Sequence, residues 1–169
     1  MKPATGPCVA ACMPFLQAAI LALIPVVAAS LLGSTVTFPQ IPTWYAGLVK
    51  PPFNPPNWLF APVWTTLFAM MAFSVFRVLR LPKGMPGRRG ALAAYHVQLL
   101  LNVLWSCAFF GLQSPAAGIV VILALLAMIV VTIARFRSLD RVSANLFWPY
   151  FAWVSFATLL NVSIWWLNR

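Results

Sequence analysis

Acid–base chemistry has two conventional candidate side chains in this sequence. Asp140 is the only acidic residue among 169, and His96 is the only histidine. Asp140 lies in a cationic stretch, where we expect an ion pair with Arg137 or Arg141, or a helix cap. His96 lies one turn inside an apolar segment, where we expect packing or a backbone hydrogen bond, with heme ligation as the alternative. Hydrolysis and proton transfer usually recruit such groups, so a conventional hydrolase is disfavoured.

Metal chemistry has equally little support. The three cysteines, Cys8, Cys12 and Cys107, are odd in number and have no histidine or carboxylate neighbours. We therefore predict neither a disulfide framework nor a metal site.

The densest chemical feature is the run from Trp44 to Trp64, in which six of twenty-one residues are aromatic and five are proline. Proline fixes φ and removes a backbone donor, so the part from Pro51 to Pro56 is not an ordinary buried helix or central strand. Disordered linkers are also proline-rich, but they contain few aromatic residues. A rigid, aromatic connector with Lys50 as its single cation indicates a lid or a binding loop.

Polar and aromatic residues recur at helical spacing in three apolar segments. Gln98, Asn102 and Trp105 fall at i, i+4 and i+7, hence on one helix face. Two further faces combine Tyr150, Trp153, Ala157 and Asn161, and Trp64, Phe68 and Met71. Together these faces could line one mostly apolar cavity, as a small-molecule site requires. The alternative is structural, because buried amides often bond a neighbouring membrane helix and aromatic stripes often serve packing or interfacial belts.

Membrane helices are needed to position these faces. The chain is 63% hydrophobic and 7% charged, unlike a soluble domain. A bilayer core of about 30 Å needs about 20 apolar helical residues. Five segments qualify, near 14–33, 58–80, 90–112, 116–136 and 144–167, with a lid loop at 34–57. Continuous apolar runs and short connectors predict an all-α membrane protein, a single five-helix transmembrane bundle over 1–169, rather than a barrel.

The net charge of +10 is unevenly divided between the two ends of the predicted bundle. One side carries only Lys50 and Arg169, and the other carries Lys2, Arg77, Arg80, Lys83, Arg88, Arg89, Arg135, Arg137 and Arg141. The positive-inside rule places the latter side, with the amino terminus, in the cytoplasm. Topology thus accounts for the cations, and we expect no nucleic-acid partner. No span carries a clear midplane charge, which disfavours an ion-coupled transporter.

The motifs form an ordered series: Trp44-Tyr45-Ala46-Gly47-Leu48, Lys50-Pro51, Pro55-Pro56, Trp58, Pro62-Val63-Trp64, Gln98-x3-Asn102-x2-Trp105, Phe109-Phe110-Gly111 and Pro149-Tyr150-x2-Trp153-x2-Phe156-Ala157-Thr158-x2-Asn161. This series resembles the translocator protein (TspO/MBR) family, also called tryptophan-rich sensory proteins or peripheral-type benzodiazepine receptors. The resemblance covers residues 44–161, about 70% of the chain. It favours a bacterial member in the cell membrane.

The resemblance implies a dimeric five-helix protein with a ligand cavity under the first loop. Family members bind porphyrins such as protoporphyrin IX or heme, and also sterols and synthetic benzodiazepine-type ligands, so we expect a porphyrin ligand, with sterol or lipid as further partners, and no required cofactor. The ligand-contacting positions that it carries over are Trp64, Asn102, Trp153, Phe156, Ala157 and Leu160, with Trp44, Tyr45 and Pro55 in the lid. To these the residue patterns add Phe68, Gln98, Trp105 and Tyr150, and Lys50 could pair with a porphyrin propionate.

One departure concerns sterols. The family's cholesterol-recognition pattern needs a tyrosine followed by a basic residue, but Val162 and Ser163 stand where tyrosines are typical and Trp166 replaces the arginine. The sequence therefore disfavours high-affinity sterol binding through that motif.

Three functions remain in order of preference. The first is a membrane receptor or sensor for porphyrins, linked to tetrapyrrole and stress regulation. The second is light- and oxygen-dependent porphyrin breakdown, for which Trp64 and Trp153 are the candidate catalytic residues. The third is tetrapyrrole or sterol transport, ranked last because no midplane charge or inverted repeat supports active transport. For the dimer face, the span at 116–136 offers the small residues Ala117, Gly118, Ala124 and Ala127.

Overall fold

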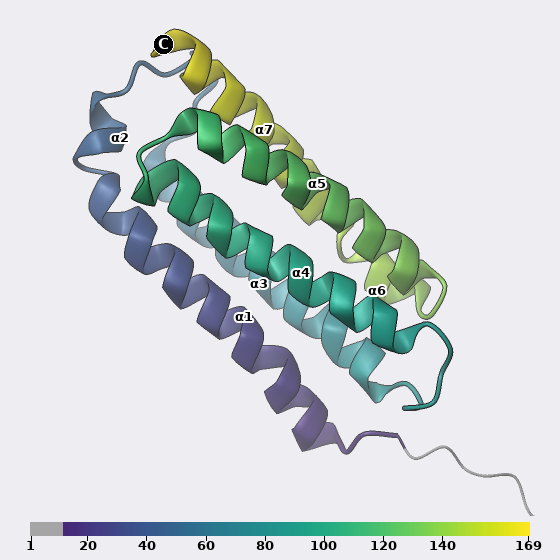
Figure 1. The fold of residues 1–169 in the computed structure, drawn as a ribbon. Helices are drawn as coiled ribbons and strands as arrows, with labels where there is room; N and C mark the ends of the chain where they lie inside the picture. The colour runs from purple at the N-terminus through teal and green to yellow at the C-terminus, as the bar shows by residue number, and fades with distance from the viewer. Residues whose placement is uncertain (1–11) are drawn as a thin grey trace, which may run out of the picture.

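The computed structural model describes residues 12–169, so Lys2 and Cys8 lie outside the described residues. Every regular element in this part is helical, and five helices are long and apolar enough to cross a membrane (Figure 1). The prediction of an all-α protein with five transmembrane helices is confirmed. The long helices are α1 (Phe15–Thr37), α3 (Asn57–Arg80), α4 (Arg88–Ser106), α5 (Pro115–Arg137) and α7 (Trp148–Leu167).

Two helix boundaries differ from the sequence prediction. The predicted loop at 34–57 begins in helix, since α1 runs to Thr37 and continues as a 3₁₀ turn, Phe38–Gln40. Proline is tolerated in the first turn of a helix, so Pro39 does not end the helical path. The predicted span at 144–167 is divided into α6 (Arg141–Asn145) and α7, where Pro149 likewise lies in the first turn.

Helix packing places α1 against α3 and α4, and α5 against α4 and α7. In Figure 1, α1 lies along one side of the bundle. Its buried residues Ala18, Ala22, Val26 and Ala29 form one narrow stripe at helical spacing. The rest of α1 is mostly exposed and apolar, as a surface that faces lipid tails must be.

Helix α5 does not present all of its small residues outward. Ala124 and Ala127 are exposed, but Gly118 is buried, because it packs against Asn161 and Phe109 of the same chain. The inclusion of Gly118 in a dimer face is therefore wrong.

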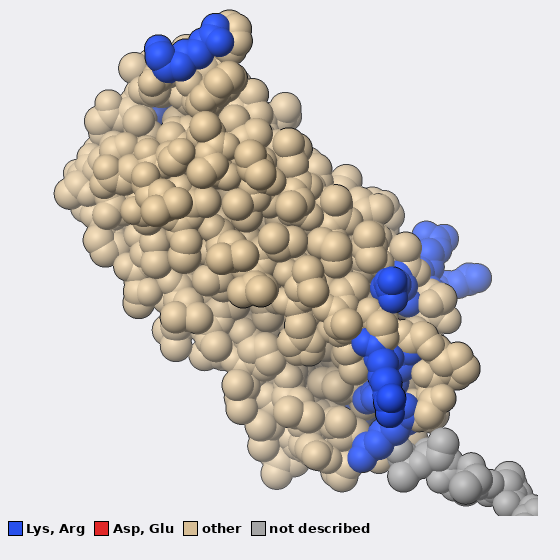
Figure 2. All heavy atoms as spheres, in the orientation of Figure 1, with Lys and Arg blue, Asp and Glu red and all other residues tan. Residues whose placement is uncertain are grey.

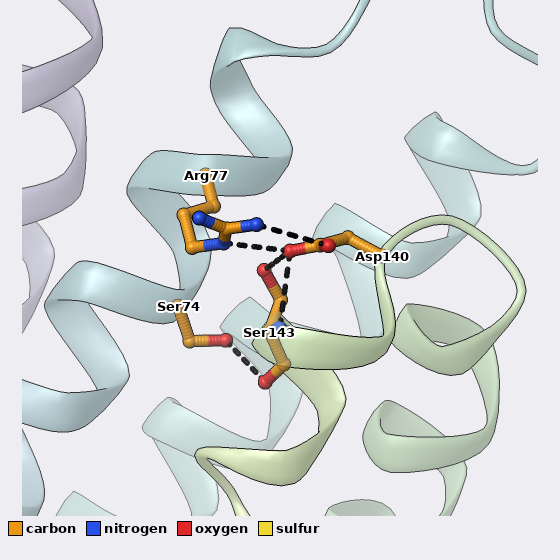
Figure 3. A network of polar contacts seen from close by, with 4 residues as sticks. All are labelled: Ser74, Arg77, Asp140 and Ser143. Atoms are coloured by element: carbon orange, nitrogen blue, oxygen red, sulfur yellow. Dashed lines mark hydrogen bonds and ion pairs between the residues drawn. The ribbon is translucent and has the colours of Figure 1, made fainter.

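On the face shown in Figure 2, the lysine and arginine side chains gather at two opposite ends, with an uncharged belt between them. At the more cationic end, Asp140 caps α6 by accepting from the backbone N–H of Ser143 (3.1 Å). Its ion pair is with Arg77 of α3 (Nε to Oδ2, 2.8 Å), and not with Arg137 or Arg141 as predicted (Figure 3). The cap directs the carboxylate toward α3, where Ser74 also donates to the Ser143 carbonyl (2.8 Å). This network ties α3 to the start of α6.

Candidate ligand cavity

A cavity of about 190 Å³ lies between α1, α3, α4 and α7, beneath the short helix α2 (Trp44–Gly47). Helix α1 supplies only small side chains along most of its wall, whereas α3 and α4 supply two indole rings. The residues that line the cavity are Ala29, Ser30, Gly33, Ser34, Thr37, Phe38, Ile41, Tyr45, Asn57, Phe60, Ala61, Trp64, Thr65, Phe68, Asn102, Trp105, Ser106, Phe109, Phe110, Ala157, Leu160, Asn161 and Ile164.

The amide groups of the cavity wall are held by bonds between helices. Asn102 donates to the Tyr150 hydroxyl (3.0 Å). Trp105 Nε1 donates to Asn161 Oδ1 (3.2 Å), and Asn161 donates in turn to the Pro115 carbonyl (2.8 Å). These bonds fix the orientation of Asn102 and Trp105 and join α4 to α7.

The carboxyl end of α4 continues as a π-helical turn, Cys107–Gly111. The backbone N–H of Leu112 bonds the Cys107 carbonyl (2.8 Å), which is an i to i−5 bond. The wider turn allows two consecutive side chains, Phe109 and Phe110, to be buried and to line the cavity. Phe109 stacks on Trp105 at 5.7 Å between ring centroids. Sequence reasoning placed these phenylalanines in a motif but not in the site.

The lid closes the cavity through Tyr45, which is 5% exposed and donates to Asn54 (2.8 Å). Burial raises the pKa of the Tyr45 hydroxyl above its ordinary value, so the group is neutral at physiological pH. Lys50 lies 4.7 Å above the Tyr45 ring and donates to the carbonyls of Ala46 and Leu48.

The lid is also attached to the end of α7. Asn168 accepts from the Val49 N–H and donates to the Val49 carbonyl, both at 2.9 Å. No sequence pattern pointed to Asn168, because its partner is 119 residues away.

The lining offers binding and stacking rather than acid–base chemistry. Tyr45 is the one ionisable side chain among the residues that line the cavity. His96 lies outside it, exposed, with Nδ1 bonded to the Leu92 carbonyl (2.7 Å), which is one of the two default expectations for this side chain. Within residues 12–169 no group of three potential metal ligands occurs.

Comparison with known proteins shows the family of this sequence. Residues 21–167 match the sequence model of the TspO/MBR family. The chain belongs to the TspO/MBR family. It is 44% identical over 137 residues to tryptophan-rich protein TspO of Chlorobaculum tepidum, which covers 80% of this chain and 86% of that protein. The protein of the same name from Archaeoglobus fulgidus is 39% identical over 149 residues (88% and 95%). Translocator protein of Ovis aries is 35% identical over 127 residues (75% and 75%).

Seven of the fourteen residues that were predicted, from the family resemblance or from residue patterns, to bind a ligand do line the cavity. They are Tyr45, Trp64, Phe68, Asn102, Trp105, Ala157 and Leu160. The small α1 residues opposite them were missed, since alanine, serine and glycine in an apolar helix carry no distinguishing pattern.

The other seven predicted residues lie outside the lining, and several of them contact or cover residues that line it. Trp44 packs edge-on against Phe109 (5.4 Å), Tyr150 holds Asn102, and Lys50 and Pro55 belong to the lid. Gln98 lies deeper in the bundle against Met71. Trp153 and Phe156 contact each other on α7, and Trp153 packs on Phe60 of α3 (5.9 Å).

Proposed function

We propose that this TspO/MBR protein is a membrane sensor that binds a porphyrin, protoporphyrin IX or heme, in the cavity beneath α2. The observation that carries the proposal is the pair of indoles, Trp64 and Trp105, on the wall of an otherwise largely apolar cavity. A porphyrin is flat and aromatic, and indole rings favour stacked or edge-on contact with such a surface. The amides of Asn102 and Asn161 add a few fixed polar groups, as small-molecule sites commonly do.

Porphyrin binding requires the cavity to widen. Its volume of about 190 Å³ is below the roughly 300–1,000 Å³ of typical ligand pockets. Helix α1 is the wall best able to move, because it packs on α3 and α4 through a stripe of small residues and is otherwise exposed. The ligand is thus expected to displace α1 outward or to lift the lid.

Lys50, which lies in the lid, can bind a carboxylate of the proposed ligand. Its ammonium group binds two backbone carbonyls beside Tyr45, and both bonds can be exchanged for a charge-assisted bond to a propionate. Lys50→Gln is therefore expected to weaken binding of protoporphyrin IX more than that of its dimethyl ester.

The direct test is a titration followed by porphyrin absorbance, which does not depend on protein tryptophan. Trp64→Leu and Trp105→Leu should each weaken binding by about 2- to 12-fold, the range expected for loss of one aromatic contact. Trp58→Leu is the matched control, because Trp58 lies on α3 and is 71% exposed. Wild-type affinity in both cavity variants would exclude this cavity as the site.

A second candidate function, light- and oxygen-dependent breakdown of the bound porphyrin, is favoured by the oxidisable Trp64 in a lining without carboxylate or imidazole groups. Illumination of the complex in air should give a product that dark or anaerobic samples lack. Trp64→Phe should keep much of the binding and lose the product. Equal bleaching of free porphyrin under the same light would argue against turnover.

A further inference from the structure

The cationic end of the bundle contains two kinds of basic side chain. Three are bonded within the protein: Arg77 pairs with Asp140, Arg80 donates to the Met13 carbonyl (2.9 Å), and Arg88 donates to the carbonyls of Val78 (3.1 Å) and Leu79 (2.9 Å). These arginines complete the ends of helices α1 and α3 and the start of α6.

Five other cations at this end make no such bond. The side chains of Lys83, Arg89, Arg135, Arg137 and Arg141 are exposed and have no hydrogen bond or ion pair within residues 12–169. Asp140, the only acidic residue of the sequence, is already occupied by Arg77. Any counter-charge for these five must therefore come from another molecule.

Two of the five line one hollow, and a third lies beside its edge. Lys83 and Arg89 line a shallow hollow of about 340 Å³ formed by the α3–α4 loop and the first turn of α4, and Gly90 forms part of its edge. Arg135 reaches across from α5 and lies over Gly90, where any Cβ would collide with its guanidinium group. The glycine thus allows a third cation to approach the hollow.

We propose that this hollow binds the phosphate of an anionic phospholipid through Lys83, Arg89 and Arg135. Guanidinium groups bind phosphate oxygens in pairs, and lysine adds a compact charge. The positive-inside rule explains which side the cations occupy, but it does not require three of them to lie in or beside one hollow.

A lipid is the source of phosphate because of where the hollow lies. Helix α3 has 24 residues and is therefore about 36 Å long, which exceeds the roughly 30 Å hydrocarbon core. A helix of this length that spans the core would carry its last residue, and with it the first residue of α4, to the level of the lipid headgroups. Clusters of Lys and Arg at this level attract anionic lipids.

The experiment compares two variants with the same loss of charge. Arg89→Gln/Arg135→Gln removes one cation from the hollow and one from its edge, and Arg137→Gln/Arg141→Gln removes two from the neighbouring turn. Nanodiscs of phosphatidylcholine with a small fraction of phosphatidylglycerol would be used, and retained lipid counted by native mass spectrometry after release. Wild type and the Arg137/Arg141 variant should retain phosphatidylglycerol selectively, and the Arg89/Arg135 variant should lose about tenfold or more of that selectivity.

A third variant tests geometry without changing charge. Gly90→Ala should displace Arg135 and lower the selectivity, while circular dichroism and a monodisperse elution profile verify the fold. Equal losses in the two double variants, or no preference for phosphatidylglycerol in wild type, would overturn the proposal. So would binding of inorganic phosphate at the hollow without lipid selectivity, since the ligand would then be a soluble anion.

Discussion

At the residue scale, two polar atoms in the middle of the bundle lack a partner. Tyr95 Oη and Gln98 Oε1 make no hydrogen bond within the described residues, and both side chains are fully buried. A buried polar group without a partner costs about 1–3 kcal/mol. Both residues lie on α4 and precede Asn102 in the sequence. The helix that supplies Asn102 to the cavity wall therefore also carries two buried polar groups without a hydrogen bond.

Tyr95→Phe should therefore raise the free energy of unfolding, by about 1–3 kcal/mol, because it removes the unpaired hydroxyl and keeps the ring. Tyr150→Phe is the matched control and should lower stability, since the Tyr150 hydroxyl accepts from Asn102. Thermal unfolding in one detergent measures both. A loss of stability in Tyr95→Phe would mean that this hydroxyl has a partner such as a bound water.

Asp140 should make stability depend on pH. The Arg77 guanidinium, with help from Ser143, holds the pKa of the Asp140 carboxyl well below its ordinary value. A lowered folded-state pKa stabilises the fold above the unfolded pKa, near 4, and this contribution declines as pH falls further. The midpoint of thermal unfolding should thus decrease as pH is lowered from 5 toward 3.

Two substitutions separate the roles of this carboxylate. Asp140→Asn keeps an N-cap residue and loses the ion pair, whereas Asp140→Ala loses both, and the cap alone is worth about 0.5–2 kcal/mol. Asp140→Ala should be the less stable variant, and both should unfold with a smaller pH dependence than wild type. An unchanged pH dependence would assign the effect to another group.

At the scale of elements, the contact between α5 and α7 depends on Gly118. A Cβ at this position would lie 2.7 Å from Asn161 Oδ1 and 3.0 Å from the Phe109 ring. Gly118→Ala should lower stability, because overpacking costs about 1–3 kcal/mol against a gain of about 1 kcal/mol in helix propensity. Gly47→Ala, where a Cβ meets no atom within 4 Å, is the control. Equal unfolding midpoints for the two variants would contradict this account.

Local patterns predicted the long helices well but not all of their internal features. Apolar runs and flanking prolines located the five spans to within a few residues at most ends. The break before α7 was missed because Leu146 and Phe147 are apolar and Pro149 is acceptable in a first turn. The Arg77 to Asp140 pair was missed because its members are 63 residues apart.

Helical spacing predicted which helix faces line the cavity better than it predicted how far along each helix the cavity extends. Spacing of i, i+4 and i+7 correctly grouped Gln98, Asn102 and Trp105 on α4, but it does not say how far the cavity extends. Four residues of helix correspond to about 6 Å, which suffices to place Gln98 below the cavity floor. Helical spacing also could not reveal the π-helical turn that brings Phe109 and Phe110 together.

At the scale of the whole molecule, the uneven distribution of cations predicts orientation. The end that carries Lys83 should face the cytoplasm, and the lid with Lys50 should face the opposite side. In a background without cysteine, Lys50→Cys should react with an impermeant maleimide added outside intact cells, and Lys83→Cys should react only after permeabilisation. The reverse labelling pattern would invert the topology.

The resemblance to the family implies a dimer, and the outer face of α5 is where this expectation can be tested. Ala124 and Ala127 are exposed there, and small residues allow membrane helices to approach closely. Ala127→Trp should convert dimer to monomer, as measured by cross-linking in vesicles, and Leu31→Trp on the exposed face of α1 should not. A dimer that survives Ala127→Trp would place the interface elsewhere.

The π-helical turn at Cys107–Gly111 has a consequence for comparing relatives. A π-helical turn contains one residue more than an α-helical turn and forms no loop. In this turn both Phe109 and Phe110 line the cavity. A homologue one residue shorter between Trp105 and Leu112 would align with a single gap at a span boundary. That gap would mark a differently shaped cavity wall, rather than neutral drift in the length of a connector.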